Sequence, residues 1–129
     1  MTTLRDITSA LECTVHHYTD DFDTAPLTTV CASDLMSDVL ALVDEGILLI
    51  TSLASDQALR TADIVGARAV LLVNGKRVHQ SMVELAEEFG IALMATKHDT
   101  YRVCAQLGSF PELCPQSSKT SIADDNHRK

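Results

Sequence analysis

Four consecutive residues, Lys97 to Thr100, place an ammonium, an imidazole, a carboxylate and a hydroxyl side by side. Such groups could act as base, acid and nucleophile if the fold directed them at one point. Adjacent residues that leave a strand point in different directions, so a small hydrolase or transferase that uses His98 and Asp99 is only a minor alternative. Asp99 before an apolar periodic segment is typical of a helix N-cap. We therefore interpret the cluster as a helix start beside which a ligand could bind.

Motifs for phosphate binding and nucleophilic catalysis are absent from the sequence. It contains no G-x-x-x-x-G-K-[ST], no G-x-G-x-x-G, no nucleophile elbow and no H-E-x-x-H. His16 and His17, next to an acidic segment, leave a metal site open as a less favoured alternative, whereas His79 is expected to be exposed. We predict no catalytic residue, no metal and no cofactor, and hence that the protein is not an enzyme.

Length and composition indicate one soluble domain. The 129 residues are 46% hydrophobic and 4% aromatic, which favours a core of Leu, Val, Ile and Ala. A net charge of −8, with ten scattered Lys and Arg residues, would repel a nucleic acid backbone. The longest apolar runs have about five residues, whereas a membrane span needs about 20. We expect no nucleic acid or membrane partner and, because the first residues lack a hydrophobic segment, a cytoplasmic protein.

The four cysteines form no C-x-x-C pair and have no histidine at zinc-ligand spacing. A disulfide framework is improbable in a chain with this much apolar content. Free cysteine packs as a small hydrophobic residue. We therefore predict ordinary buried or tail thiols at Cys13, Cys31, Cys104 and Cys114.

A short helix and two extended segments are predicted in the first 32 residues. Thr3 is a suitable N-cap for a helix with one apolar face. Residues 13–18 alternate in a way that suits a strand, and an acidic loop separates them from a second extended segment at 27–32.

A helix is predicted next, over residues 34–46. Ser33 or Asp34 is a suitable N-cap, and apolar residues recur at helical spacing behind it. Gly46 fits the left-handed residue that ends such helices.

The middle of the chain repeats a strand and a helix three times. The strands begin 22 residues apart, at Ile47, Ala69 and Ile91, and Gly66 and Gly90 stand where helix-ending glycines are expected. Such spacing is the minimum for parallel crossover connections. The predicted helices are 55–66, 80–90 and 99–108.

These strands are apolar almost throughout, so both of their faces must be covered. The predicted fold class is α/β, a three-layer α/β/α domain with a mainly parallel sheet built from consecutive β-α units. The last helix should direct Val103, Cys104 and Leu107 at the sheet. The domain should cover residues 1–108, and residues 109–129, rich in Ser, Pro and charge, should be a disordered tail.

A parallel sheet brings the carboxyl ends of its strands to one edge, where ligands bind near helix N-termini. The same residue types also form ordinary turns and caps, an alternative that stays open. Small polar groups and two cations could there hold an anionic metabolite or a nucleotide. The candidate ligand-binding residues are Thr51, Ser52, Asn74, Gly75, Lys76, Thr96, Lys97, His98 and Asp99.

The segment from Thr29 to Leu107 resembles the DRTGG domain and the N-terminal, non-catalytic domain of HPr kinase/phosphorylase. The matching pieces are ASDLMSDVLA, ILLIT, AVLLVNG, ELAEEFGIALMAT and TKHDTYRVCAQL. The family's Asp-Arg pair would fall where this chain has SLASDQ, and its Thr-Gly-Gly corresponds to Val73-Asn74-Gly75.

The resemblance implies a regulatory or interaction module without catalysis of its own. Such modules are often homodimeric and occur attached to CBS domains, to phosphotransacetylase or to HPr kinase. Stand-alone members are often encoded near iron-only hydrogenase systems, which suggests a link to a hydrogenase or metabolic system. The machinery for phosphoryl transfer lies in a separate domain of HPr kinase, so we predict no kinase activity. The alternative function is a sensor for a small anionic ligand, and a protein partner is also expected.

Overall fold

Six strands form one sheet in the computed structural model, which describes residues 1–42 and 46–115. All neighbouring strands run parallel except β1 and β5, which are antiparallel. The strand order across the sheet is β1 (Thr14–His17), β5 (Ala92–Ala95), β4 (Ala69–Leu72), β3 (Leu48–Thr51), β2 (Thr29–Ala32) and β6 (Cys114–Pro115).

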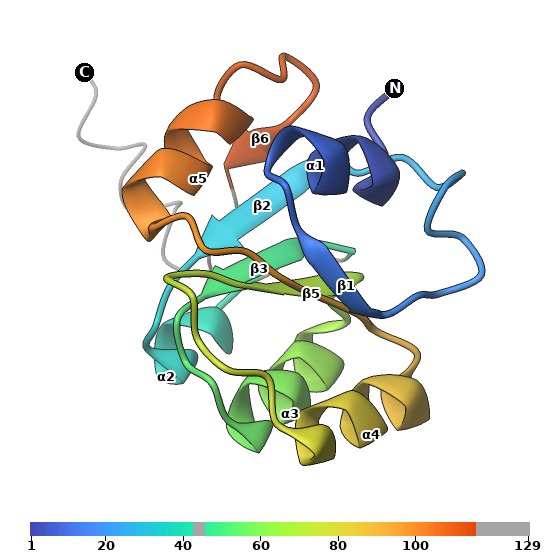
Figure 1. Ribbon diagram of the computed structural model, residues 1–129, viewed down its shortest axis with the longest axis vertical. Helices are drawn as coiled ribbons and strands as arrows, with labels where there is room; N and C mark the ends of the chain where they lie inside the picture. Colours follow the sequence, from blue (N-terminus) through green and yellow to red (C-terminus); the bar gives the residue numbers. More distant parts are fainter. Residues whose placement is uncertain (43–45, 116–129) are drawn as a thin grey trace.

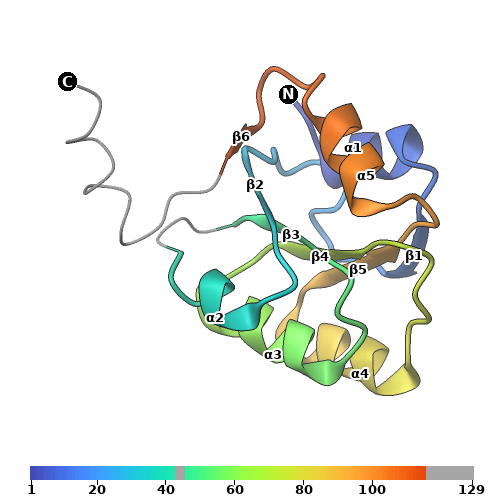
Figure 2. The same ribbon diagram turned by 90° about the vertical axis from the view of Figure 1, so that its left-hand side faces the viewer.

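Helices cover both faces of this sheet (Figures 1 and 2). On one face lie α2 (Met36–Val39), α3 (Asp56–Val65) and α4 (Gln80–Phe89). On the other lie α1 (Leu4–Ala10) and α5 (Thr100–Leu107). The predicted three-layer α/β/α fold with a mainly parallel sheet is therefore confirmed.

The burial of the strands explains these layers. Every residue of β3 and β4 is buried, and alternate side chains enter the two apolar clusters on either side of the sheet. Leu49 and Val70 face α3 and α4, whereas Leu48 and Leu71 face α1 and α5. The edge strand β1 instead alternates between exposed and half-buried residues, as expected where only one face is covered.

The helix ends match the sequence prediction at four positions. Gly66 and Gly90 end α3 and α4 with φ values of +70° and +69°, a conformation that glycine adopts without a steric penalty. Thr3 forms a capping box with Asp6 at the start of α1. Asp99 caps α5 by accepting a hydrogen bond of 2.8 Å from the Arg102 amide.

The helix predicted over residues 34–46 is wrong in length, because α2 has only four residues. Neither expected cap, Ser33 or Asp34, caps α2, whose N-cap is Leu35. Ser33 Oγ accepts a hydrogen bond from the Leu35 amide, and Asp34 accepts hydrogen bonds from the Ser52 amide and Thr51 Oγ1 at the end of the neighbouring strand. The Asp34 carboxylate is therefore not available to the first turn of α2. The part of the prediction over residues 43–45 lies outside the described residues.

One predicted core residue of α5 is also wrong. Val103 and Leu107 are buried against the sheet, but Cys104 is exposed. One residue along a helix turns the side chain by about 100°, so Cys104 points away from the face that Val103 buries. Cys31 is buried and Cys13 half-buried, as predicted.

The segment expected to be a tail begins with ordered structure. Phe110 and Leu113 pack against the core beneath α1 and α5, and Cys114 pairs with Thr29 of β2. Thr2 Oγ1 donates a hydrogen bond of 2.6 Å to the Glu112 carboxylate, which ties this segment to the start of the chain. The sheet therefore includes residues past the predicted boundary at Gly108, and residues 116–129 lie outside the described part of the chain.

Candidate functional site

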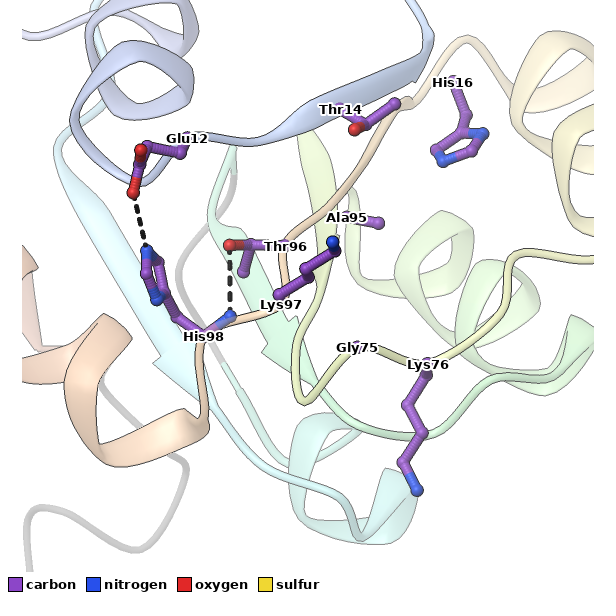
Figure 3. Close-up of a pocket in the computed structure, with 9 residues that line it drawn as sticks. All are labelled: Glu12, Thr14, His16, Gly75, Lys76, Ala95, Thr96, Lys97 and His98. Atoms are coloured by element: carbon purple, nitrogen blue, oxygen red, sulfur yellow. Dashed lines mark hydrogen bonds and ion pairs between the residues drawn. The ribbon is translucent and has the colours of Figure 1, made fainter.

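An open pocket of about 530 Å³ lies at the edge of the sheet where β4 and β5 end and β1 begins. Because β1 is antiparallel to β5, Thr14 at its start pairs with Ala95 at the end of β5. Three segments far apart in sequence thus meet at one place (Figure 3). The lining residues are Glu12, Thr14, His16, Gly75, Lys76, Ala95, Thr96, Lys97 and His98.

Lys97 supplies a cation to this pocket. Figure 3 shows its side chain extending toward Thr14 and Ala95, while Lys76 extends the other way from the opposite wall. Thr14 and His16 are both exposed and, two residues apart on a strand, lie on the same side of β1. Within the described residues neither lysine has an ion-pair partner within 4.0 Å. The arrangement can bind an anion through an ammonium, a hydroxyl and an imidazole.

His98 and Glu12 form an ion pair at the other end of the pocket. His98 Nε2 lies 3.2 Å from Glu12 Oε1, and their side chains are 23% and 81% exposed. The His98 ring is therefore half-buried, whereas the Glu12 side chain is exposed. The pair is charged only when the imidazole is protonated.

The loops after β4 and β5 are held together by main-chain hydrogen bonds. The amides of Asn74 and Gly75 donate to the carbonyls of His98 and Thr96 at 2.8 and 3.1 Å. Asn74 and Gly75 have φ values of +68° and +65°, the conformation of a tight turn that favours Asn-Gly. The turn thus fixes one wall of the pocket against the other.

Thr96 forms part of the pocket floor and also supports it. The residue is 5% exposed, and its hydroxyl donates a hydrogen bond of 2.9 Å to the Leu11 carbonyl. The same oxygen accepts from the His98 amide at 3.3 Å. Thr96 therefore joins the end of α1 to the loop that carries Lys97.

Two predicted site residues, Thr51 and Ser52, lie in a separate hydrogen-bonded group at the end of β3. The Ser52 amide donates to Asp34 at 2.7 Å, and Thr51 Oγ1 donates to the same carboxylate oxygen at 3.2 Å. These bonds, with the Ser52 amide as the main cause and the Lys76 charge as a minor one, lower the pKa of Asp34 below its usual value. The group stabilises the chain's own turn.

The structure therefore brings together five of the nine predicted residues and separates four. Gly75, Lys76, Thr96, Lys97 and His98 line the pocket, whereas Thr51, Ser52, Asn74 and Asp99 do not. Asn74 Nδ2 donates to Thr100 Oγ1 at 3.2 Å, and Asp99 serves as the helix cap. The sequence prediction missed Glu12, Thr14, His16 and Ala95.

Histidines elsewhere do not assemble a metal site in the described ranges 1–42 and 46–115, which hold no group of three His, Cys, Asp or Glu side chains suited to a metal ion. His17 Nδ1 donates to the Ile91 carbonyl at 3.0 Å, and His79 precedes α4 without a side-chain cap bond.

Burial raises the pKa of Cys13 to about 11, so its thiol stays protonated near neutral pH. In the described part of the chain no helix is long and apolar enough to cross a bilayer.

The model of one protein family, the DRTGG domain, matches residues 6–110. This chain belongs to the DRTGG domain family. The match covers all of the residues that line the pocket. No curated protein is significantly similar to this DRTGG domain in sequence.

A solved structure of similar fold comes from Clostridium perfringens pyrophosphatase. It holds the CBS and DRTGG domains of that protein's regulatory region, complexed with the activator diadenosine tetraphosphate. The TM-score is 0.70 at 16% sequence identity, and the alignment covers 82% of this DRTGG domain protein. It covers 46% of the other chain, so our protein spans about half of that structure's length.

Proposed function

We propose that this protein is a non-catalytic regulatory module that binds a small anionic metabolite or a nucleotide in the pocket between β1, β4 and β5. The observation that carries the proposal is the Lys97 ammonium, which extends into the pocket toward Thr14 and Ala95 (Figure 3). At the β3 end of the edge, the Thr51 hydroxyl, the Ser52 amide and the Asp34 carboxylate already bond to one another, so the pocket is the more open place for a ligand.

A phosphate ester or a carboxylate fits this chemistry. A lysine binds either group as a point charge, and a hydroxyl and an imidazole add directed hydrogen bonds. The activator in the Clostridium perfringens structure is a phosphorylated nucleotide, which supports including nucleotides among the candidates. The pocket volume of about 530 Å³ is within the range of about 300–1,000 Å³ that small-molecule sites occupy.

The absence of catalysis is part of the same proposal. The imidazole of His98 is engaged by Glu12, and Asp99 is used as a helix cap, so the two do not address a common point. Burial raises the pKa of the Cys13 and Cys31 thiols, which disfavours the nucleophilic thiolate. We expect no kinase activity, and a radiolabel assay with an HPr-like substrate would contradict this if the pure protein phosphorylated it.

We further propose that the module acts as a homodimer on a protein partner; the link to a hydrogenase system stays a prediction of the family resemblance. Exposed apolar side chains support an interaction surface, since Leu35 before α2 and Ile64 on α3 are 59% and 71% exposed. Analytical ultracentrifugation at micromolar concentration tests the dimer. A purely monomeric mass there would contradict it.

A thermal-shift screen tests the ligand. A ligand that binds only the folded state stabilises it by mass action, about 2.7 kcal/mol at 100 times its dissociation constant. We expect a nucleotide or a phosphorylated or carboxylated metabolite to raise the unfolding midpoint of the wild-type protein. Lys97→Ala should weaken that ligand at least about tenfold. Arg60→Ala, which removes an exposed cation on α3 outside the pocket, is the matched control and should leave binding unchanged.

Two results of the screen would count against the proposal. One is a panel that raises the midpoint for no compound. The other is a ligand whose affinity falls equally in the Lys97 and Arg60 variants, because this would show that affinity depends on the net charge of the protein and not on the cation in the pocket.

A further inference from the structure

Among the described residues that line the edge pocket, Glu12 is the one carboxylate. A negative charge there opposes the binding of an anion, because two like charges a few ångströms apart repel each other. In the structure the charge is turned away. Figure 3 shows the Glu12 carboxylate directed at the His98 ring, while Lys97 extends away from this pair, toward Thr14 and Ala95.

The backbone at Glu12 gives a second and independent sign that this side chain has a role. Glu12 has a φ of +55°, and in the described ranges only Asn74 among the other non-glycine residues has a positive φ. The position directly follows the C-cap of α1, where glycine or asparagine is usual because the left-handed conformation is costly for other residues. Glutamate thus stands where glycine would be less strained, and its side chain reaches His98.

The side chain of His98 has one hydrogen-bond partner in the described part of the chain, which is Glu12. Its backbone is held separately, by the Thr96 hydroxyl and by the Asn74 amide. The imidazole is therefore not needed to shape the loop. The contact that its ring makes is with the Glu12 carboxylate.

We propose that Glu12 is a built-in competitor, a carboxylate that competes with anionic ligands for the pocket cation Lys97. His98 is the positioning residue that keeps the Glu12 carboxylate away from Lys97. With Glu12 bound to His98, the Lys97 ammonium is free for an anionic ligand. Glu12 also lines this pocket, so the carboxylate, once released, can turn toward Lys97 and neutralise part of its charge. The inference rests on the proposed function, since it concerns the affinity of the same site.

Besides Glu12, Lys97 and His98, the charged and titratable groups among the described lining residues are Lys76 and His16. Both are present in every variant below, so their contribution cancels in the comparison. Glu87→Gln, which removes one exposed negative charge from α4, is a matched control for the change in net charge.

The experiment uses inorganic phosphate as the probe. An NMR titration of the amides of Gly75 and Lys97 gives the dissociation constant of the wild-type protein and of each variant. We expect Glu12→Gln to bind phosphate about three- to fivefold more tightly and His98→Ala about three- to fivefold more weakly. The dissociation constant of the double variant should lie within about twofold of that of Glu12→Gln, because His98 acts only through Glu12. Glu87→Gln should leave the constant unchanged.

Glu12→Gly offers a readout that a merely structural role would not produce. Glycine relieves the positive φ, so we expect a higher unfolding midpoint together with the same gain in phosphate affinity as Glu12→Gln. If Glu12 only stabilised the turn through His98, the midpoint would fall.

The outcomes separate the two proposals. If Glu12→Gln binds phosphate with unchanged or lower affinity, the competitor role is overturned, but the anion pocket is not. The competitor role is also overturned if the double variant binds phosphate as weakly as His98→Ala alone, because His98 would then contact the anion directly. If neither the wild-type protein nor Glu12→Gln binds phosphate, the anion pocket is overturned, and the competitor role with it.

Discussion

Two parts of the same sheet edge carry similar residues in different states. At the ends of β2 and β3, Thr51 and Ser52 are bonded to Asp34, so their hydrogen-bonding groups are used within the chain. At the ends of β4 and β5 and the start of β1, Lys97 and Thr14 point into an open pocket. Residue type at a strand end therefore does not identify a binding site. A strand end can bind a ligand only where its polar groups are not already hydrogen-bonded to other residues of the same chain.

The comparison also shows why a ligand site needs support. In the open part, the Thr96 hydroxyl and the amides of Asn74 and Gly75 are hydrogen-bonded, and these bonds hold the two loops in place. The exposed cation sits on this rigid base. A site with fixed walls loses less conformational freedom when a ligand binds.

Exchanging a threonine in each part should give the largest contrast. Thr51→Val removes a hydroxyl that is 1% exposed and bonded to Asp34 and to the Leu53 amide, so we expect a loss of about 1–3 kcal/mol in the free energy of unfolding. Ligand affinity should not change. Thr14→Val, at an exposed strand position, should change stability by less than about 0.5 kcal/mol but weaken the ligand. Chemical denaturation and a ligand titration check both variants. Equal losses of stability in the two variants would contradict the difference between the two parts of the edge.

A smaller effect is expected from the carboxylate of the closed part. The pKa of Asp34 is lowered in the folded state, so its ionised form adds stability above the ordinary aspartate pKa of about 3.9, and this stability is lost as the pH falls through the lowered value. In Asp34→Asn this acid-side dependence should be absent. Because Asp34 is largely exposed, the difference at pH 7 should stay below about 1 kcal/mol.

Urea unfolding of the wild-type protein and of this variant between pH 2 and 7 tests the sign. If the free energy of unfolding depends on pH in the same way in both proteins, the Ser52 and Thr51 hydrogen bonds do not favour the ionised carboxylate.

The smallest expected effect links the two parts. The charge of Lys76 contributes to the lowered pKa of Asp34, although less than the hydrogen bonds from Ser52 and Thr51. Lys76→Gln should therefore raise the pKa of Asp34 slightly, by less than Ser52→Pro, which deletes the main donor. An NMR titration of the Asp34 carboxyl carbon measures both. A larger shift in the Lys76 variant would mean that the two parts of the edge are electrostatically one site.

The sequence predicted the regular part of the fold because each signal there is local. The strands β3, β4 and β5 are apolar throughout, and Gly66 and Gly90 mark the helix ends between them. The length of α2 could not be predicted, since Asp34 has a partner at Ser52 that competes with the helix. That partner is distant in sequence and visible only once β2 and β3 lie side by side.

The candidate site was predicted in part for the same reason. The loops after β4 and β5 follow from parallel connectivity, so Lys76 and Lys97 were found. Thr14 and His16 were missed because the pairing of β1 with the end of β5 is a long-range contact. The alternation of exposed residues in β1 indicates an edge strand but not the strand beside which it lies.

The central claim is that the ligand binds in the open part of the edge. Amide chemical-shift mapping with the most stabilising compound of the thermal screen tests it most directly. We predict that the largest changes fall on residues 12–16, 75–76 and 95–98, with residues 33–35 and 51–53 unaffected. The largest changes at residues 33–35 and 51–53 would contradict the account, because the ligand would then occupy the part of the edge that the chain's own hydrogen bonds fill.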